Sequence, residues 1–324
     1  MTGLTRRTAL CGAAALAFAS SAHAQKLSDR TISIIVPFTA GSGPDILARL
    51  AAEEIRARWG QAVIVDNRPG ASGTIGAGAV NRAQPDGHTL MLWVNTLLMN
   101  AAMARNLTFD AVRGFTPIID VADGVLALAV HSSVDVKDAP ALITQTKAKP
   151  DMIRYASPGR GTPHHFAMEL FKLRTGALMD HIPYTGTAGA VNDFVAGHVQ
   201  AMFIPIHVGL SHARAGRIKL LAVGSPKRTP LAPDVPTLAE QGVRDVEVNL
   251  GYGLSAPPGT PQEIIQRFNA VMNEILADQR VVKLLEQQGL SPVGGMSASF
   301  VQRIDDEAPR WVAVVKAAGI SAEN

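Results

Sequence analysis

The first segment whose residue types could do chemistry is Gly-Ser-Gly-Pro-Asp at residues 41–45. Ser42 stands three residues before Asp45, which is the spacing of a helix capping pair, and Pro44 suits the first helical turn. A helix N-terminus offers several N–H groups without partners and about half a positive charge. Such a turn can hold a small anion without Lys or Arg. The sequence therefore predicts half of a carboxylate-binding cleft here.

The same pattern returns roughly one lobe's length later in the chain. Residues 153–157 are expected as a short strand, and residues 159–161, Gly-Arg-Gly, as a loop after it. Thr162 is placed to cap the following helix, and Pro163 suits its first position. Because the chain builds two such turns, we expect two lobes that face one cleft.

The elements that must position these turns alternate between strands and helices. Residues 32–36 form a β-branched apolar run typical of a strand buried on both faces. Helices are expected at residues 44–59 and 73–83. Further strands are expected at residues 62–65, 89–94, 118–121, 125–130, 153–157, 182–186, 200–204, 218–223 and 246–256. This alternation predicts an α/β fold with a parallel, doubly wound sheet.

The N-terminus has the features of an export signal. Arg6 and Arg7 precede the apolar residues 9–19, and Ala-His-Ala at 22–24 is a small-x-small cleavage site. We therefore expect a signal peptide over residues 1–24, with cleavage between Ala24 and Gln25 and a periplasmic mature protein. The paired arginines leave both the general secretory and the twin-arginine routes open.

Composition excludes several classes of function. The single cysteine, Cys11, lies in the expected signal peptide, so the mature chain holds no thiol. Without Arg6 and Arg7 the chain has 28 basic and 27 acidic residues, which indicates no nucleic-acid partner. The 324 residues are 47% apolar, which is enough for two lobes with real cores.

Metal and cofactor sites are weakly supported. His165 and Glu169 share one face of the expected helix, but two ligands without a third do not make a metal site. Gly41 and Gly43 lack the third glycine of a dinucleotide fingerprint, because Ile46 occupies its place. We therefore expect no metal and no cofactor.

Six segments, taken in order along the chain, resemble the extracytoplasmic solute receptors of tripartite tricarboxylate transporters, the Bug family. They are IVPFTAGSGPDILAR, VDNRPGASGTIGA, PDGHTL, YASPGRGTPHHFAMELF, HIPYTG and GLSAPPGTP. The resemblance implies a two-lobed periplasmic binding protein of the Venus-flytrap type, with a doubly wound sheet in each lobe. It also implies a monomer that captures a small carboxylate and delivers it to two integral-membrane transporter subunits.

The lobes that we expect are interleaved in the sequence. Residues 25–121 and 247–324 would form lobe 1, and residues 122–246 would form lobe 2. The hinge would then lie in the two crossover segments, near Val121 and near Val246.

The resemblance assigns the ligand to the two turns described above. In lobe 1 it implies contacts from Phe38, Thr39, Ala40, Gly41, Ser42, Gly43 and Asp45. In lobe 2 it implies contacts from Ser157, Gly159, Arg160, Gly161, Thr162 and His164, with Tyr184 and Thr185 nearby. For Asp45 the alternative is an ion pair with Arg49 on its own helix, and for Arg160 it is a solvated position at the rim.

Four further residues are candidates for the cleft. Asn95 and Thr96 follow a strand at the carboxyl edge of the sheet, where ligands collect, although they could also cap the next helix. Ile204 and Pro205 are the other two, and Ile204 stands where this family often has a polar or acidic residue, so an acid that would recognise an amine is missing. Together with Trp93 they favour an aliphatic or aromatic carboxylate.

Two other functions remain as alternatives. A liganded receptor of this kind could engage a membrane sensor kinase instead of a transporter. A periplasmic hydrolase or isomerase on the same scaffold would need a nucleophile with a base. Ser42 and Ser157 are outside any G-x-S-x-G motif, and no His and Asp pair can be assigned to them. We therefore expect no catalytic residue.

Overall fold

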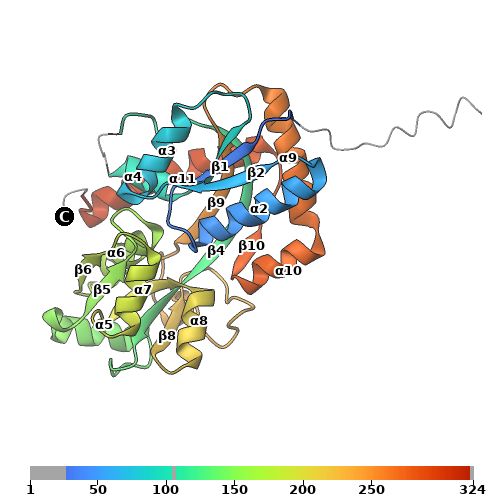
Figure 1. The fold of residues 1–324 in the computed structure, drawn as a ribbon. Coiled ribbons are helices and arrows are strands. Elements are labelled where there is room, and N and C mark those ends of the chain that lie inside the picture. Colours follow the sequence, from blue (N-terminus) through green and yellow to red (C-terminus); the bar gives the residue numbers. More distant parts are fainter. Residues whose placement is uncertain (1–26, 104–106, 322–324) are drawn as a thin grey trace, which may run out of the picture.

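The computed structural model describes residues 27–103 and 107–321, so the expected signal peptide lies outside the described residues. The chain forms an α/β fold with two lobes, which Figure 1 shows one above the other. The described residues build one ten-stranded sheet that runs through both lobes. No helix in this part of the chain combines the length and apolar composition that crossing a bilayer requires.

Lobe 1 is built on five neighbouring strands of this sheet. Their order is β2 (Val63–Asn67), β1 (Ile32–Val36), β3 (Thr89–Val94), β9 (Asn249–Ala256) and β4 (Thr116–His131). The first three are parallel, whereas β9 is antiparallel to both of its neighbours. A short strand, β10 (Leu290–Pro292), also pairs antiparallel with β4. The expected parallel arrangement is thus confirmed for β2, β1 and β3, and it is wrong for β9.

Six α-helices and one 3-10 turn complete lobe 1. They are α2 (Gly43–Trp59), η1 (Ala71–Gly73), α3 (Thr74–Asn81), α4 (Thr96–Ala102), α9 (Gln262–Ala277), α10 (Gln279–Gln287) and α11 (Ser297–Ala318). Their apolar faces bury the strands, so that Ile32, Ile34 and Val36 of β1 have no exposed surface. Burial of this kind contributes roughly 1.5–3 kcal/mol for each large apolar side chain.

Lobe 2 repeats the plan with a parallel group beside antiparallel strands. Its elements are α5 (Ala139–Ala148), η2 (Pro150–Met152), β5 (Arg154–Ser157), α6 (Pro163–Thr175), β6 (Asp180–Pro183), α7 (Thr187–Val195), β7 (Ala201–Pro205), α8 (Ile206–Arg214), β8 (Ile218–Val223) and η3 (Ala239–Gln241). Strand β5 is parallel to β6 and β7, whereas β7 and β8 are antiparallel to β4.

Strand β4 belongs to both lobes. As far as Val125 it pairs with β9, and from Leu126 onward it pairs with β7 and β8. The apolar runs at 118–121 and 125–130, which were expected as separate strands, are therefore one strand. The residues between them stay extended because β9 and β10 pair with them on either side. Gly124 is needed there, since a Cβ atom would lie 3.0 Å from Leu290 and 3.1 Å from Leu250.

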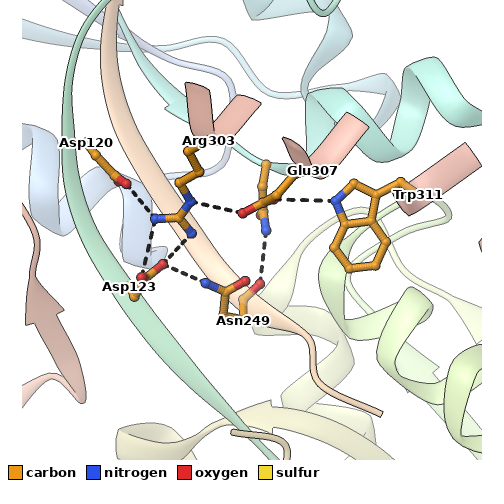
Figure 2. A network of polar contacts seen from close by, with 7 residues as sticks. Asp120, Asp123, Asn249, Arg303, Glu307 and Trp311 are labelled. Carbon is orange, nitrogen blue, oxygen red and sulfur yellow. Dashed lines mark hydrogen bonds and ion pairs between the residues drawn. The ribbon is translucent and has the colours of Figure 1, made fainter. Parts of the chain in front are cut away.

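An arginine of α11 holds β4 just before it changes partners (Figure 2). Arg303 forms ion pairs with Asp120 at 2.5 Å, with Asp123 at 2.6 Å and with Glu307 at 2.9 Å. Asn249, the first residue of β9, donates a hydrogen bond to Asp123 at 2.6 Å. Burial raises the pKa of Asp120 to about 6, although Arg303 opposes that shift. The guanidinium is therefore the shared partner of three acidic side chains.

The same helix continues the connection into lobe 2. Trp311 is fully buried and donates from its indole nitrogen to Glu307 at 3.4 Å. Its ring lies edge-on to Phe166 of α6, with 5.7 Å between the ring centroids. Helix α11 thus contacts β4 on one side and a helix of lobe 2 on the other.

We expect Arg303→Ala to lower the free energy of unfolding by about 3 kcal/mol, because it leaves buried acidic groups without their cation. Urea denaturation at neutral pH, followed by circular dichroism, measures this loss. Arg30→Ala is the control, since Arg30 pairs with Asp86 at 2.7 Å but its side chain is 67% exposed. Exposed pairs contribute at most about 1 kcal/mol, so equal losses in the two variants would contradict the role of Arg303.

Candidate functional site

A cavity between the lobes is lined by residues of both. The space between these residues amounts to about 740 Å³, a volume that includes the part open to solvent. Of the predicted site residues, those that line it are Phe38, Gly41, Ser42, Gly43, Thr96, Thr162, His164 and Pro205. The two predicted turns therefore face the same space.

The other predicted residues lie behind or beside this lining. They are Thr39, Ala40, Asp45, Asn95, Ser157, Gly159, Arg160, Gly161, Tyr184, Thr185 and Ile204. Several of them hold the two loops in shape, as the contacts below show.

In the first loop the hydrogen bonds differ from the expected capping pair. Ser42 occupies the N-cap of α2, but its hydroxyl donates to the carbonyl of Thr39 at 2.6 Å. The carboxylate of Asp45 accepts from the N–H of Gly41 at 2.8 Å, one residue earlier than a capping box requires. Gly41 has a φ of 77°, which glycine adopts without strain. These hydrogen bonds link residues of the loop and of the first turn of α2 to one another, and Gly41, Ser42 and Gly43 lie at the cavity.

Asp45 itself points away from the cavity. It pairs with Arg49 at 3.0 Å and accepts from the side-chain amide of Asn67 at 2.9 Å. Burial alone would raise the pKa of Asp45, but hydrogen bonds from Arg49, Gly41 and Asn67 together hold it below its ordinary value. Asp45 therefore forms an ion pair with Arg49 on its own helix, which the sequence analysis gave as the alternative to a ligand contact.

In the second loop the expected cap is present. Thr162 precedes α6, its hydroxyl donates to the carbonyl of Gly159 at 2.7 Å, and it accepts from the N–H of His165 at 3.5 Å. Gly161 has a φ of 82°, in the left-handed region that favours glycine. The loop is therefore bent so that Thr162 and His164 reach the cavity.

His164 is the most unusual side chain of the lining. It is 7% exposed, and both of its ring nitrogens are buried without a hydrogen-bond partner in the described part of the chain. Burial lowers the pKa of His164 to about 3, and it also lowers the pKa of the second cavity histidine, His207. Both imidazoles are therefore neutral at physiological pH, and none of the described residues at the cavity wall carries a formal charge.

The cavity's polarity comes instead from the starts of helices. The first turns of α2, α6, α7 and α8 contribute Gly43, Pro163, Thr187 and His207 to the lining. The N–H groups of a first turn have no partner within the helix, and the helix dipole adds a partial positive charge. Two of these helices begin on loops that the sequence identified, whereas α7 and α8 were not expected to contribute.

The sequence reasoning also missed a largely apolar part of the wall. Its residues come from distant segments and are Val94, Gly124, Val125, Val208, Leu250, Tyr252, Gly289 and Leu290, together with the polar Gln288. Burial raises the pKa of Tyr252 well above its ordinary value, so its hydroxyl stays protonated. This hydroxyl lies opposite the first loop, 2.8 Å from where a Cβ atom of Gly43 would be. A side chain at position 43 would collide with this hydroxyl unless Tyr252 moved, so glycine fits the position best.

Arg160 and Asn95 lie outside the lining. Burial lowers the pKa of His181 to about 3, and the charges of His165 and Arg160 make smaller contributions in the same direction. Asn95 does not cap α4 with its side chain. Its amide donates to the carbonyl of Asn249 at 3.0 Å and so joins β3 to β9.

Ser157 has a histidine partner that the sequence did not reveal. Its hydroxyl lies 2.7 Å from the Nε2 atom of His181, in a stack of rings with Tyr155 and His165. The other ring nitrogen of His181 has no acidic partner among the described residues, and Ser157 is fully buried outside the cavity. A nucleophile needs an oriented base and access to substrate, so this pair supports the loop and does not form a catalytic site.

Comparison with known proteins shows the same architecture. The chain matches the family described as Tripartite tricarboxylate transporter family receptor over residues 47–320. The BugT protein of Bordetella pertussis is 34% identical over 320 residues, covering 98% of each chain. An R. palustris protein solved with adipate has a TM-score of 0.86 at 31% identity, covering 92% of this chain and 98% of that one.

Two further solved structures agree. The periplasmic binding protein BugD has a TM-score of 0.84 at 30% identity, covering 91% of this chain and 99% of its own. MatC from Rhodopseudomonas palustris, solved with bound malate, has a TM-score of 0.83 at 28% identity, covering 88% and 99%. With its two lobes and interlobe cavity, the chain belongs to the tripartite tricarboxylate transporter receptor family, whose fold is that of periplasmic solute-binding proteins.

Proposed function

We propose that this protein is an exported, monomeric receptor that captures a small carboxylate between its lobes and delivers it to the integral-membrane subunits of a tripartite tricarboxylate transporter. The observation that carries the proposal is the meeting of helix N-termini from both lobes at a cavity whose lining has no charged side chain. An anion placed there would receive N–H groups from α2 in lobe 1 and from α6 in lobe 2. A ligand held from both sides favours the closed arrangement of the lobes.

His164 supports the same interpretation. A buried polar group without a partner is costly, and native proteins satisfy nearly all of them. His164 lines the cavity with its ring nitrogens buried, so a rotation of the ring on ligand binding would bring a nitrogen to a hydroxyl, a carboxyl group or a bound water of the complex. Because this imidazole is neutral, one of its nitrogens can donate and the other can accept.

The ligand class follows from the combination of helix starts and apolar side chains in the lining. The helix starts suit one carboxylate, whereas Val125, Val208, Leu250 and Leu290 suit an apolar chain or ring. The two R. palustris proteins were solved with adipate and with malate, both small dicarboxylates. We propose an aliphatic di- or tricarboxylate or an aromatic acid as the ligand of this chain.

Lobe movement would use the two crossovers between the sheets. Strand β4 changes partners between Val125 and Leu126, and the second crossover precedes β9 at Asn249. We place lobe 1 at residues 25–121 and 247–324 and lobe 2 at 122–246. A ligand that contacts Gly124 and Val125 at the cavity wall would therefore lie directly beside the hinge.

The closed, liganded form could instead be recognised by a membrane sensor kinase. The cavity is the same in both cases, so binding of the acid does not distinguish them. A deletion of the transporter genes that leaves induction by the acid intact would favour the sensor. A hydrolase or isomerase is disfavoured by the buried position of Ser157.

We expect carboxylates to raise the melting temperature of the mature protein and neutral analogues to leave it unchanged. A ligand at about a hundred times its Kd stabilises a protein by about 2.7 kcal/mol. A fluorimetric thermal scan with adipate, malate and benzoate, each beside its amide, measures the effect. Stabilisation by the amides or by sugars, without any by the acids, would exclude a carboxylate ligand.

Thr162 and Arg160 separate backbone recognition from side-chain charge. We expect Thr162→Val to weaken binding of the most stabilising acid about fivefold, because it removes the hydroxyl that bonds Gly159 and caps His165. Arg160→Gln is the control and should change the Kd less than twofold, since Arg160 is not among the residues that line the cavity. Isothermal titration calorimetry measures both, and the reverse ranking would mean that the guanidinium holds the ligand.

The neutral state of His164 predicts a dependence of stability on pH. An unfolded histidine takes up a proton below about pH 6.5, whereas folded His164 has a pKa of about 3, so acid favours the unfolded state. Relative to His164→Gln, the wild-type protein should lose about 1.4 kcal/mol per pH unit below pH 6.5.

Urea denaturation at several pH values between 7 and about 4 measures this slope. His198→Gln is the control, because the side chain of His198 is 70% exposed, unlike that of His164. If His164→Gln and the wild type lose stability in parallel as the pH falls, His164 is not a buried neutral group.

A further inference from the structure

A hydrogen bond crosses from lobe 1 to the ligand loop of lobe 2. The hydroxyl of Ser72 donates to the backbone carbonyl of Arg160 at 2.6 Å. Ser72 lies in η1, between β2 and α3, and is 88 residues away from its partner in the chain. Neither residue lines the cavity, so this contact belongs to the support of the site and not to its wall.

The bonded peptide is fixed at both of its polar groups. The carbonyl of Arg160 accepts from Ser72, and the N–H of the same peptide, at Gly161, donates to the Nδ1 atom of His165 at 3.3 Å. In a trans peptide the carbonyl and the N–H point in opposite directions. One contact from each lobe therefore sets the orientation of the peptide between Arg160 and Gly161. This peptide lies just ahead of Thr162, the N-cap of α6.

Close packing at Gly161 shows that the lobes meet at this point. A Cβ atom at Gly161 would lie 2.4 Å from Met103 and 2.5 Å from the side-chain oxygen of Asn100, both in lobe 1. At Gly159 it would lie 3.2 Å from the hydroxyl of Ser72. The second ligand loop thus fits against lobe 1 only because these positions are glycine.

The backbone of Ser72 has an unfavourable conformation at this contact between the lobes. Ala71 and Ser72 have φ values of 46° and 52°, in a region that residues other than glycine rarely adopt. The side-chain amide of Asn100, on α4, donates to the carbonyl of Ser72 at 3.0 Å and helps to hold it there. Such strain persists where surrounding contacts over-determine it, and it concentrates at functional positions.

We propose that Ser72 is a positioning residue for the ligand loop of lobe 2, which it orients through the carbonyl of Arg160 only when the lobes are together. The inference deepens the proposed function and rests on it. A contact made only in the closed arrangement shifts the equilibrium between open and closed lobes towards closure. Ser72 therefore couples closure to the shape of the loop that carries Thr162 and His164.

The test compares Ser72→Ala with Thr74→Ala. Thr74 lies two residues away, and its exposed hydroxyl bonds only within the same turn, to Ala71 at 3.0 Å. The mature chain has no cysteine, so Ile64→Cys in lobe 1 and Leu178→Cys in lobe 2, both at exposed positions, can carry spin labels. Distances between the labels report the populations of open and closed lobes, which a merely local role in folding would not change.

We expect Ser72→Ala to lower the ratio of closed to open molecules about two- to tenfold, the effect of one lost hydrogen bond, and Thr74→Ala to leave it unchanged. Ser72→Gly also lacks the hydroxyl but relieves the left-handed strain, so it should open as Ser72→Ala does. The proposal is overturned if Ser72→Ala matches Thr74→Ala, or if Ser72→Gly keeps the wild-type distances.

Adding adipate or malate separates this proposal from the proposed function. If either acid closes the wild-type protein and closes Ser72→Ala less, the result supports both the carboxylate ligand and the role of Ser72. If neither acid changes the wild-type distances while Ser72→Ala still opens the free protein, the role of Ser72 stands and binding of these carboxylates fails. If the acids close both proteins equally at every concentration, the ligand class stands and the role of Ser72 is overturned.

Discussion

One continuous strand determines how the two lobes relate to each other. Because β4 pairs with β9 as far as Val125 and with β7 and β8 from Leu126, each lobe's sheet contains part of the same strand. Any rotation of the lobes must be absorbed at this change of partners and at the second crossover before β9. Arg303 fixes the lobe 1 side by binding Asp120 and Asp123, so the rotation is confined to the residues that follow. Those residues, Gly124 and Val125, line the cavity, so the proposed ligand site would lie beside the proposed hinge.

The second constraint is that the proposed site would have to attract an anion with no charged side chain among the described residues of its lining. A Lys or Arg enclosed between closing lobes would lose its hydration at a cost of several kcal/mol. Helix N-termini avoid most of that cost, because their N–H groups are already oriented and their partial charges are small. The neutral imidazoles of His164 and His207 are consistent with the same environment. Such a site holds a carboxylate by geometry, which leaves the apolar wall around Leu250 and Leu290 to choose among acids.

The sequence predicted those parts of the site that depend on local pattern. Turns followed by Pro44 and Pro163 indicated two helix starts, and both lie at the cavity because strand, loop and helix are adjacent in the chain. It could not predict Tyr252 or Leu290, which reach the cavity only through the order of strands in the sheet. It divided β4 in two, because Asp123 and Gly124 interrupt an apolar run whose pairing is non-local. The hydrogen bonds of Ser42 and the pairing of Ser157 with His181 depend on side-chain rotamers that no spacing rule specifies.

The segment at residues 65–77 shows how a motif can matter without touching a ligand. It contributed to the family resemblance, yet one of its polar contacts, that of Ser72, goes to the backbone of the opposite lobe. If closure brings Ser72 and Asn100 against Gly159 and Gly161, an acid too long for the cavity would keep the lobes from meeting and leave this contact unmade. Binding and size discrimination would then share one mechanism, since only an acid that permits closure gains the second loop in its bound shape. The clearance at Gly161, which is too small for a single Cβ atom, makes that discrimination sharp.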